Sequence, residues 1–339
     1  MIVVRADAQA IADAARRLRS GGLVAFPTET VYGLAAVISD EGAIVRVFEA
    51  KGRPPTHPLI AHVLDVAAAR DLSSNWTPAF NPLIAHVGDL AAARQIARFD
   101  GPALALAEAF WPGPLTLVVD KAARVSPLVT GGADSVAIRA PSHRVARALI
   151  SAVGAPLVAP SANRYQTLSP TRAEHVVMSL GDSDVLVLDG GACTGGIEST
   201  VVDARGDHIV ILRLGGVSPD QLRAIDPQLT QASLTISSDA RRRSPGMDDR
   251  HYAPRARLVI LPTRAEAVAR ALETGAALVT FGEVTGAISL SDDPASASHD
   301  LYATLHAIDA SGATEIVVEA PPQTPGWEAI SDRLTRASR

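Results

Sequence analysis

The sequence of 339 residues predicts an α/β protein in two parts, because short apolar strands alternate with amphipathic helices along most of its length. The chain is longer than one usual domain. Residues 226–240 are polar and lose clear periodicity, as a linker does. We therefore expect a larger first domain at residues 1–225, a linker at 226–254 and a small α/β domain at 255–339.

Composition narrows the class of protein. Hydrophobic residues make up 47% of the chain and charged residues 20%, which is typical of a folded protein. The net charge of −5 argues against nonspecific binding to nucleic acid or to an anionic membrane, although a local basic cleft stays open. No apolar run approaches the roughly 20 residues that span a bilayer, and the N-terminus does not resemble a secretory signal. We expect a cytoplasmic protein with no membrane contact.

Metal sites are not predicted. Cys193 is the single cysteine, which excludes an internal disulfide and a cysteine-rich zinc site. The motifs of phosphate-binding loops, dinucleotide folds, nucleophile elbows and zinc proteases are absent as well. Any chemistry must therefore rest on other residues.

The N-terminal region predicts a helix, a strand and a second helix. Residues 11–18 place apolar residues at helical spacing, and Gly21 ends that helix. An apolar strand at 23–26 follows, and then a helix capped by Ser39 or Asp40. This helix ends at Lys51-Gly-Arg-Pro54 with two cations beside a turn. Taken alone, such a pair favours a basic helix terminus that complements the helix dipole.

An internal duplication comes next. Residues 57–70 recur at 81–94, 24 residues further on, and each copy predicts a strand, an Asp cap and a helix. The first copy follows the two cations directly. Because short, stiff connections fix a site, we expect His57 and His62 of the first copy to line it. The second copy, with His86, is then expected at an edge or on the surface, where an insertion costs little.

The strand at 155–158 ends in small polar residues that include Ser161 and Asn163. Ligands of open α/β sheets bind beyond the carboxyl ends of strands. A helix capped by Ser169, or by Thr171 with Glu174, should begin nearby, with its N-terminus suited to an anion. An ordinary strand, loop and helix junction explains this stretch equally well.

Further strands are expected at 115–119, at 136–141 and in a hairpin formed by 198–203 and 208–213. Antiparallel pairing in the hairpin sets Ser199 opposite Leu212 and Arg213. Strands at 258–261, 276–281 and 315–319 belong to the second domain.

Cations and hydroxyl groups therefore gather at the ends of elements. Such a set fits a ligand with several anionic groups, because a guanidinium binds carboxylate or phosphate with two parallel hydrogen bonds. The set consists of Lys51, Arg53, Arg139 and Arg213, with Thr30, Ser161, Ser169 and Ser199.

The chain also contains a series of short motifs spread over nearly its whole length. They are Phe26-Pro-Thr-Glu-Thr-Val-Tyr-Gly-Leu34, Lys51-Gly-Arg-Pro54, Pro58-Leu-Ile-Ala-His62, Phe110-Trp-Pro-Gly-Pro-Leu-Thr116, Val136-Ala-Ile-Arg139, Ala159-Pro-Ser-Ala-Asn163, Gly196-Ile-Glu-Ser-Thr-Val-Val-Asp203, Ser244-Pro-Gly-Met247 and His251-Tyr-Ala-Pro254. In this order the motifs resemble the YrdC family, and within it the two-domain threonylcarbamoyl-AMP synthases. The resemblance implies a twisted, open mixed sheet with helices, followed by a smaller Rossmann-like α/β domain.

The resemblance also implies a reaction. Bicarbonate or CO2 carboxylates the amine of L-threonine, and the carbamate attacks the α-phosphorus of ATP and expels pyrophosphate. Mg²⁺ is expected to accompany ATP. The product, L-threonylcarbamoyladenylate, would pass to a tRNA threonylcarbamoyl transferase, which modifies the adenosine next to the anticodon. Any contact of this chain with tRNA is expected to be weak.

Site residues follow from the same resemblance. Lys51 and Arg53 are implied as the catalytic cations. Threonine is assigned to Thr30, His62, Arg139, the backbone at Ala159, and Ser199. ATP is assigned to Lys51, Arg53, His57, Ser135, Ser161, Asn163, Ser169, Arg213 and Tyr252. Tyr252 would act from the linker, which makes that segment a lid. Gly is common in the family where this chain has Gln166.

Two other classes of function stay open. One is a non-catalytic module that binds tRNA or double-stranded RNA in a basic cleft. The other is a carbamoyl transferase of the related maturation type. The lack of acylphosphatase-like and zinc-finger segments argues against the second.

Overall fold

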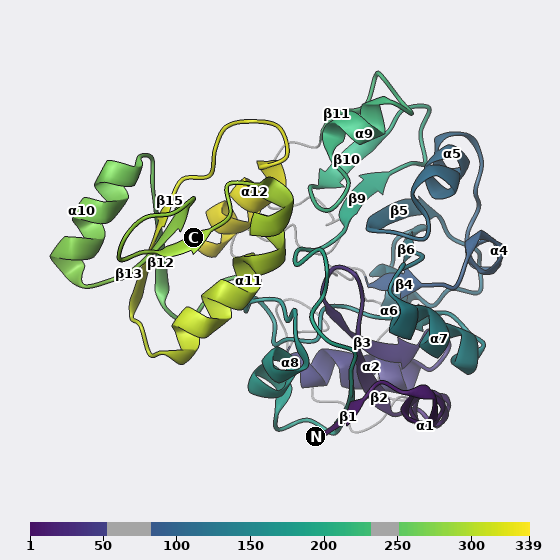
Figure 1. The fold of residues 1–339 in the computed structure, drawn as a ribbon. Coiled ribbons are helices and arrows are strands. Elements are labelled where there is room, and N and C mark those ends of the chain that lie inside the picture. The colour runs from purple at the N-terminus through teal and green to yellow at the C-terminus, as the bar shows by residue number, and fades with distance from the viewer. Residues whose placement is uncertain (53–82, 232–250) are drawn as a thin grey trace.

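The computed structural model describes residues 1–52, 83–231 and 251–339. In these residues, one large mixed sheet contains parallel and antiparallel pairs. Its strands lie in the spatial order β1 (Ile2–Arg5), β8 (Val185–Asp189), β2 (Leu23–Pro27), β3 (Tyr32–Val37), β7 (Leu157–Val158), β4 (Ile84–His86), β6 (Ser135–Arg139), β5 (Leu115–Asp120), β9 (Thr200–Asp203), β10 (Val210–Arg213) and β11 (Thr230–Gln231). The predicted open mixed sheet is confirmed (Figure 1).

Helices cover both faces of this sheet. They are α1 (Ala8–Arg19), α2 (Glu41–Ala50), α4 (Leu90–Ala93), α5 (Gly101–Phe110), α6 (Pro127–Thr130), α7 (Arg144–Val153), α8 (Ala173–Leu180) and α9 (Pro219–Arg223). α1 and α7 pack on one face with Phe26 and Leu157, while α2, α5 and α8 contribute to a larger core on the other. Of the two predicted caps for α2, Asp40 is the one that accepts a hydrogen bond, from the Ala43 N–H.

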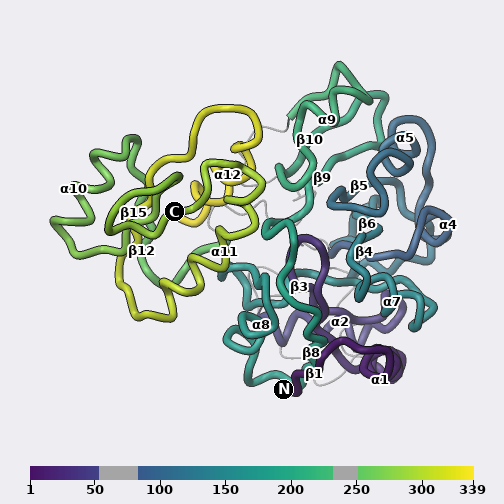
Figure 2. The backbone as a smooth tube through the Cα atoms, in the orientation of Figure 1, coloured from purple at the N-terminus to yellow at the C-terminus, as the bar shows by residue number. Residues whose placement is uncertain are grey.

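A second, smaller sheet forms the C-terminal domain. Its four parallel strands lie in the order β12 (Arg257–Leu261), β15 (Glu315–Glu319), β13 (Ala277–Phe281) and β14 (Ile288–Leu290). Helices α10 (Arg264–Thr274), α11 (Pro294–Ala310) and α12 (Glu328–Ala337) complete the domain. The predicted small α/β domain is confirmed. The N-terminus leads into β1 at the edge of the large sheet, and the C-terminus follows α12 in this second domain (Figure 2).

Helices α11 and α12 lie between the small sheet and the first domain (Figure 1). Across this junction, the His306 Nε2 atom lies 3.0 Å from the Ser169 carbonyl and the His299 Nδ1 atom 3.1 Å from the Thr194 carbonyl. Gly196 has a φ of +73°, and a Cβ there would lie 2.3 Å from the Ser298 carbonyl oxygen. Close backbone approach therefore fixes the position of α11 against the loop before β9.

The start of the linker differs from the prediction. β11 pairs with β10, beyond the expected boundary at residue 225. The Asp226 carboxylate accepts a hydrogen bond from the Ile209 N–H, at 2.7 Å. The chain thus stays attached to the first sheet as far as Gln231. Residues 232–250 lie outside the described part of the chain.

The start of α8 also corrects the sequence analysis. The helix begins at Ala173 after Arg172, without a side-chain cap, so neither Ser169 nor Thr171 caps it. Long-range hydrogen bonds replace the local ones: the Ser169 hydroxyl donates to Glu198, and the Pro170 carbonyl accepts from the Tyr32 N–H. Both predicted caps of this helix are therefore wrong.

The duplicated segment gives the third correction. β4 comes from the second copy and lies in the middle of the large sheet, between β7 and β6, instead of at an edge. The elements that follow β4 pack at once into the core, including Ala93, Ile96 and Phe99. A long connection before β4 costs little, since closure entropy grows only with the logarithm of loop length. The second copy therefore supplies a central strand together with core contacts after it.

Among the residues that the structure describes, no helix combines the length and the apolar character needed to cross a bilayer.

Candidate active site

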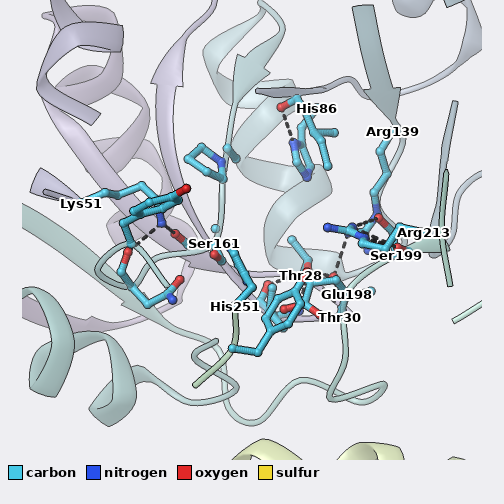
Figure 3. A pocket seen from close by; sticks show the side chains of 18 of the residues that line it. Thr28, Thr30, Lys51, His86, Arg139, Ser161, Glu198, Ser199, Arg213 and His251 are labelled. Atoms are coloured by element: carbon cyan, nitrogen blue, oxygen red, sulfur yellow. Dashed lines mark hydrogen bonds between the residues drawn. The ribbon is translucent and has the colours of Figure 1, made fainter. Parts of the chain in front are cut away.

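A pocket opens where the polar ends of several strands meet the segment that enters the second domain (Figure 3). Its described lining consists of Thr28, Thr30, Val31, Gly33, Lys51, Ile84, His86, Arg139, Ala159, Pro160, Ser161, Asn163, Arg164, Tyr165, Gln166, Glu198, Ser199, Arg213, His251 and Tyr252. Lys51, Arg139, Arg164 and Arg213 contribute cations, and Glu198 contributes the one carboxylate of this described set. The pocket therefore suits a ligand with several negative charges.

Arg139 ends β6 and is only 4% exposed. Its Nη1 donates to the Thr30 hydroxyl at 2.8 Å, its Nη2 to the Glu29 carboxylate at 2.6 Å, and its Nε to the Gly113 carbonyl at 3.2 Å. Glu29 also accepts from the Ser142 N–H at 3.0 Å. Burial alone would raise the pKa of Glu29, but the Arg139 charge and its hydrogen bond hold that pKa below its ordinary value. The guanidinium is thereby fixed in place.

Ser199 and Arg213 meet at the open end of the β9–β10 hairpin, as the sequence predicts. Arg213 Nη2 lies 3.2 Å from the Ser199 hydroxyl and 3.0 Å from its carbonyl oxygen. The Ser199 hydroxyl also forms a 2.8 Å hydrogen bond with Thr116. A register shift between Ile211 and Arg213 pairs Arg213 with Val201, and this irregularity lets the long side chain reach back.

Lys51 follows the last residue of α2 and is buried. Its ammonium donates to the carbonyl oxygens of Ser161 and Asn163, each at 2.6 Å. These bonds attach the end of α2 to the loop after β7, as Figure 3 shows. For Lys51, the interpretation as a simple basic helix terminus is therefore wrong, while Arg53 lies outside the described residues.

Asn163 Oδ1 and the Tyr252 hydroxyl are buried polar atoms of the lining, and neither has a hydrogen-bond partner within the described chain. The Asn163 amide nitrogen is satisfied by the Thr167 and Arg164 carbonyls, so the orphan oxygen has a defined direction. Gln166 and Tyr252 both have positive φ angles, of 66° and 60°, which L-residues adopt at a cost. Orphan buried atoms are rare in folded proteins, so each needs an explanation, and in a pocket a bound ligand is one.

His86 of the second copy lines the pocket and is 3% exposed (Figure 3). Burial, followed by the nearby Arg139 charge, lowers its pKa to about 3, so the ring is neutral at physiological pH. Its Nδ1 lies 3.1 Å from the Ile84 carbonyl oxygen. The expectation that the second copy lies away from the site is wrong, while His57 and His62 lie outside the described residues.

Most predicted site residues that the structure describes come together. Those that line the pocket are Thr30, Lys51, Arg139, Ala159, Ser161, Asn163, Ser199, Arg213 and Tyr252. Ser169 is fully buried outside the described lining, and its hydroxyl donates to Glu198. Ser135 begins β6, at the opposite end of the strand from Arg139, and does not belong to the lining. The strand separates these two residues by roughly 13 Å.

Sequence reasoning missed Glu29 and Glu198, each of which adjoins a predicted residue. Both residues lie inside polar motifs of the sequence, and this position could have marked them as site residues. For a metal, the described residues hold no cluster of three or more His, Cys, Asp or Glu side chains. Fixed cations in a buried site can hold anions close together and stabilise negative charge as it develops.

Comparison with known proteins gives two family matches. A family model described as telomere recombination, covering Sua5, YciO and YrdC proteins, matches residues 16–81 and 75–215. A second, described as the C-terminal domain of threonylcarbamoyl-AMP synthase, matches residues 217–339. The two segments of the first match overlap at 75–81, inside the region of the duplication.

Individual relatives span both domains. The chain is 35% identical to a threonylcarbamoyl-AMP synthase of Bacillus subtilis, over 97% of this chain and 92% of that protein. It is 34% identical to one from Pyrococcus abyssi, over 96% and 93%. A crystal structure of P. abyssi Sua5 complexed with L-threonine superposes with a TM-score of 0.85 at 34% identity, covering 99% of this chain and 96% of that one.

Proposed function

Because the chain belongs to the Sua5, YciO and YrdC family in its two-domain form, we propose that it is a threonylcarbamoyl-AMP synthase. It makes L-threonylcarbamoyladenylate from L-threonine, bicarbonate or CO2, and ATP, and releases pyrophosphate. The observation that carries the proposal is the meeting of the Arg139, Thr30 and Ser199 side chains with the Lys51 and Arg213 cations in one pocket.

Threonine binds at the Arg139 end of the pocket. A guanidinium has five N–H groups, and three of those of Arg139 are engaged by Gly113, Thr30 and Glu29. One N–H on each terminal nitrogen remains for the threonine carboxylate. Glu29 fixes the guanidinium plane before the substrate arrives, which lowers the entropic cost of binding. The L-threonine complex of the P. abyssi relative supports this substrate.

ATP binds toward Lys51, Asn163, Arg213 and Tyr252. A carbamate oxygen attacks the α-phosphorus, the bond from that phosphorus to the bridging oxygen breaks, and pyrophosphate leaves with the electron pair. The side chains hold the two reactants in line, and the cations stabilise the negative charge that develops on the leaving group.

Mg²⁺ accompanies ATP in this proposal, and the residues present fit a metal held mainly by the nucleotide. Glu198 already accepts hydrogen bonds from Arg333, Ser169 and Tyr302, so it is not a spare ligand. Asn163 Oδ1 is a neutral oxygen without a partner in the described chain, and such oxygens suit Mg²⁺. When bound, the ion neutralises phosphate charge.

The product is a mixed anhydride, and a tRNA threonylcarbamoyl transferase consumes it. The reaction takes place in the cytoplasm, where ATP and tRNA are both present. The alternative of a non-catalytic RNA-binding module fits less well. Arg139, Arg213 and Lys51 are buried in a pocket, whereas binding a nucleic-acid backbone depends on exposed cations.

The test is a pyrophosphate-release assay with the purified full chain, combined with mass spectrometry of the nucleotide product. We expect release only when L-threonine, bicarbonate and ATP are all present. Release that does not depend on threonine, or none at all, would refute the proposed function.

A further inference from the structure

Glu198 brings a buried negative charge into a pocket that is otherwise cationic in its described lining. Its carboxylate accepts hydrogen bonds from the Ser169 hydroxyl at 2.5 Å, the Tyr302 hydroxyl at 3.2 Å and Arg333 Nε at 2.7 Å. Burial alone would raise the pKa of Glu198, but the Arg333 and Arg213 charges lower it to about 2. The carboxylate is therefore ionised at neutral pH, and Glu198 lines the pocket that we assign to the triphosphate.

Arg333 is the partner that comes from the other domain. It lies on α12, is 1% exposed and reaches across the domain junction. Besides Glu198, its Nη2 donates to the Leu214 carbonyl at 2.8 Å, and its guanidinium carbon lies 4.7 Å from the centroid of the Tyr252 ring. Its Nη1 is anchored by the neighbouring Asp332 at 2.6 Å. One side chain thus touches the carboxylate of the pocket, the residue after Arg213, and the aromatic ring that carries the orphan hydroxyl.

We propose that Arg333 is a positioning residue through which the second domain sets the charge of the nucleotide end of the pocket. Its cation balances Glu198, so that the charge of Arg213 acts on the ligand and the carboxylate does not repel phosphate. Its contact with Tyr252 fixes the ring of the segment that enters the second domain. This inference rests on the proposed function, because it identifies the ligand as the triphosphate of ATP.

The physical consequence differs between the two substrates. The triphosphate carries several negative charges, whereas free threonine is a zwitterion with no net charge. An uncompensated carboxylate near the pocket therefore weakens ATP binding much more than threonine binding. If Arg333 had a purely structural role, its replacement would lower the stability of the fold and would weaken ATP binding no more than threonine binding.

The test uses the full chain and compares four proteins: wild type, Arg333→Met, Glu198→Gln and the double variant. Two quantities are measured for each: the affinity for inorganic pyrophosphate by isothermal titration calorimetry, and the KM values for ATP and threonine from pyrophosphate release. For Arg333→Met we expect about tenfold weaker pyrophosphate binding and a similar rise in the KM for ATP, with the KM for threonine changed by less than about threefold. The double variant again has a balanced charge, so its pyrophosphate affinity should return to within about threefold of wild type.

Leu334→Ala is the matched structural control, because Leu334 is 1% exposed on the same helix and packs in the core of the second domain. It should lower the melting temperature without changing pyrophosphate affinity. The inference is overturned if Arg333→Met behaves like Leu334→Ala, or if the double variant binds pyrophosphate no better than Arg333→Met.

If Arg333→Met fails to fold, the inference is tested by the pyrophosphate affinities of the other three proteins. Glu198→Gln must then bind pyrophosphate more tightly than wild type, and the double variant must equal wild type within about threefold; any other order overturns the inference. Failure of the proposed function is a separate result, because wild type would then lack threonine-dependent pyrophosphate release whatever the ranking of affinities.

Discussion

The two ends of the pocket are built in different ways. At the end that we assign to threonine, here called the threonine end, Arg139, Glu29 and Thr30 come from the first domain and hold one another through short hydrogen bonds. At the end that we assign to ATP, here called the nucleotide end, Asn163 and Tyr252 carry orphan polar atoms within the described chain, and Tyr252 packs under Arg333 of the second domain. The threonine end is therefore organised before the ligand binds, whereas the nucleotide end depends on the ligand and on the domain junction.

The largest effect should follow from disrupting the threonine end. Arg139→Ala removes the proposed carboxylate partner and leaves Glu29 buried without its cation. We expect the KM for threonine to rise at least about a hundredfold, far more than the KM for ATP, and stability to fall by about 3–5 kcal/mol. Steady-state kinetics and urea unfolding measure the two effects.

Arg139→Ala/Glu29→Gln is the control for this first prediction. It should recover much of the lost stability, because no charge is left buried and unpaired. It should recover none of the threonine affinity. Recovery of both would mean that Arg139 acts through the fold and not through the substrate.

The duplication gives a sharper test of the same end. Because His86 lines the pocket beside Arg139, His86→Ala should raise the KM for threonine by about tenfold. His62→Ala, the same change in the first copy, should then be mild. The opposite ranking would show that the first copy supplies the histidine of the site.

Deletion of residues 58–81 joins His57 to Pro82, regenerates one motif and should keep synthase activity.

At the nucleotide end, two tyrosines form a matched pair. Tyr252→Phe removes an orphan hydroxyl, so stability should hold or rise by up to about 1 kcal/mol, while the KM for ATP rises about threefold to tenfold. Tyr302→Phe removes a hydroxyl that donates to Glu198, so stability should fall. Thermal melts and ATP titrations compare the pair, and a loss of stability in Tyr252→Phe would show that its hydroxyl has a partner in the protein.

The smallest effect concerns acid stability. The folded pKa of Glu198 lies near 2, below its ordinary value of 4.5. Its charge therefore stabilises the folded state fully above about pH 4.5, and this contribution is lost as the pH falls toward 2. Wild type should lose stability over this interval more steeply than the Glu198→Gln/Arg333→Met variant, as measured by urea unfolding at a series of pH values. Equal slopes would contradict the ionised state assigned to Glu198.

Local sequence patterns predict correctly those elements that interactions between residues near in sequence determine. The β9–β10 hairpin brought Ser199 and Arg213 together, and Asp40 capped α2. The sequence predictions are wrong where contacts between residues far apart in the sequence determine the partner of a side chain. The local pattern predicts that Ser169 caps a helix, yet its hydroxyl donates to Glu198, 29 residues away. Arg333 lies 135 residues from Glu198, and no local pattern relates the two.

The duplicated segment could not be resolved from sequence for a different reason. Both copies contain Pro-Leu-Ile-Ala-His-Val, so the strand that enters the sheet is identical in either choice. Only the packing of the elements that follow β4 distinguishes them, and that packing is tertiary. The connection length before the strand, on which the sequence prediction rests, does not decide which copy supplies β4.

The measurement that tests the difference between the two ends most directly is pyrophosphate release by the full chain while threonine and ATP are varied independently. Wild type, Arg139→Ala and Tyr252→Phe are compared. The structure predicts that Arg139→Ala raises mainly the KM for threonine and that Tyr252→Phe raises mainly the KM for ATP. Equal changes in both constants for either variant, or the reverse assignment, would contradict it.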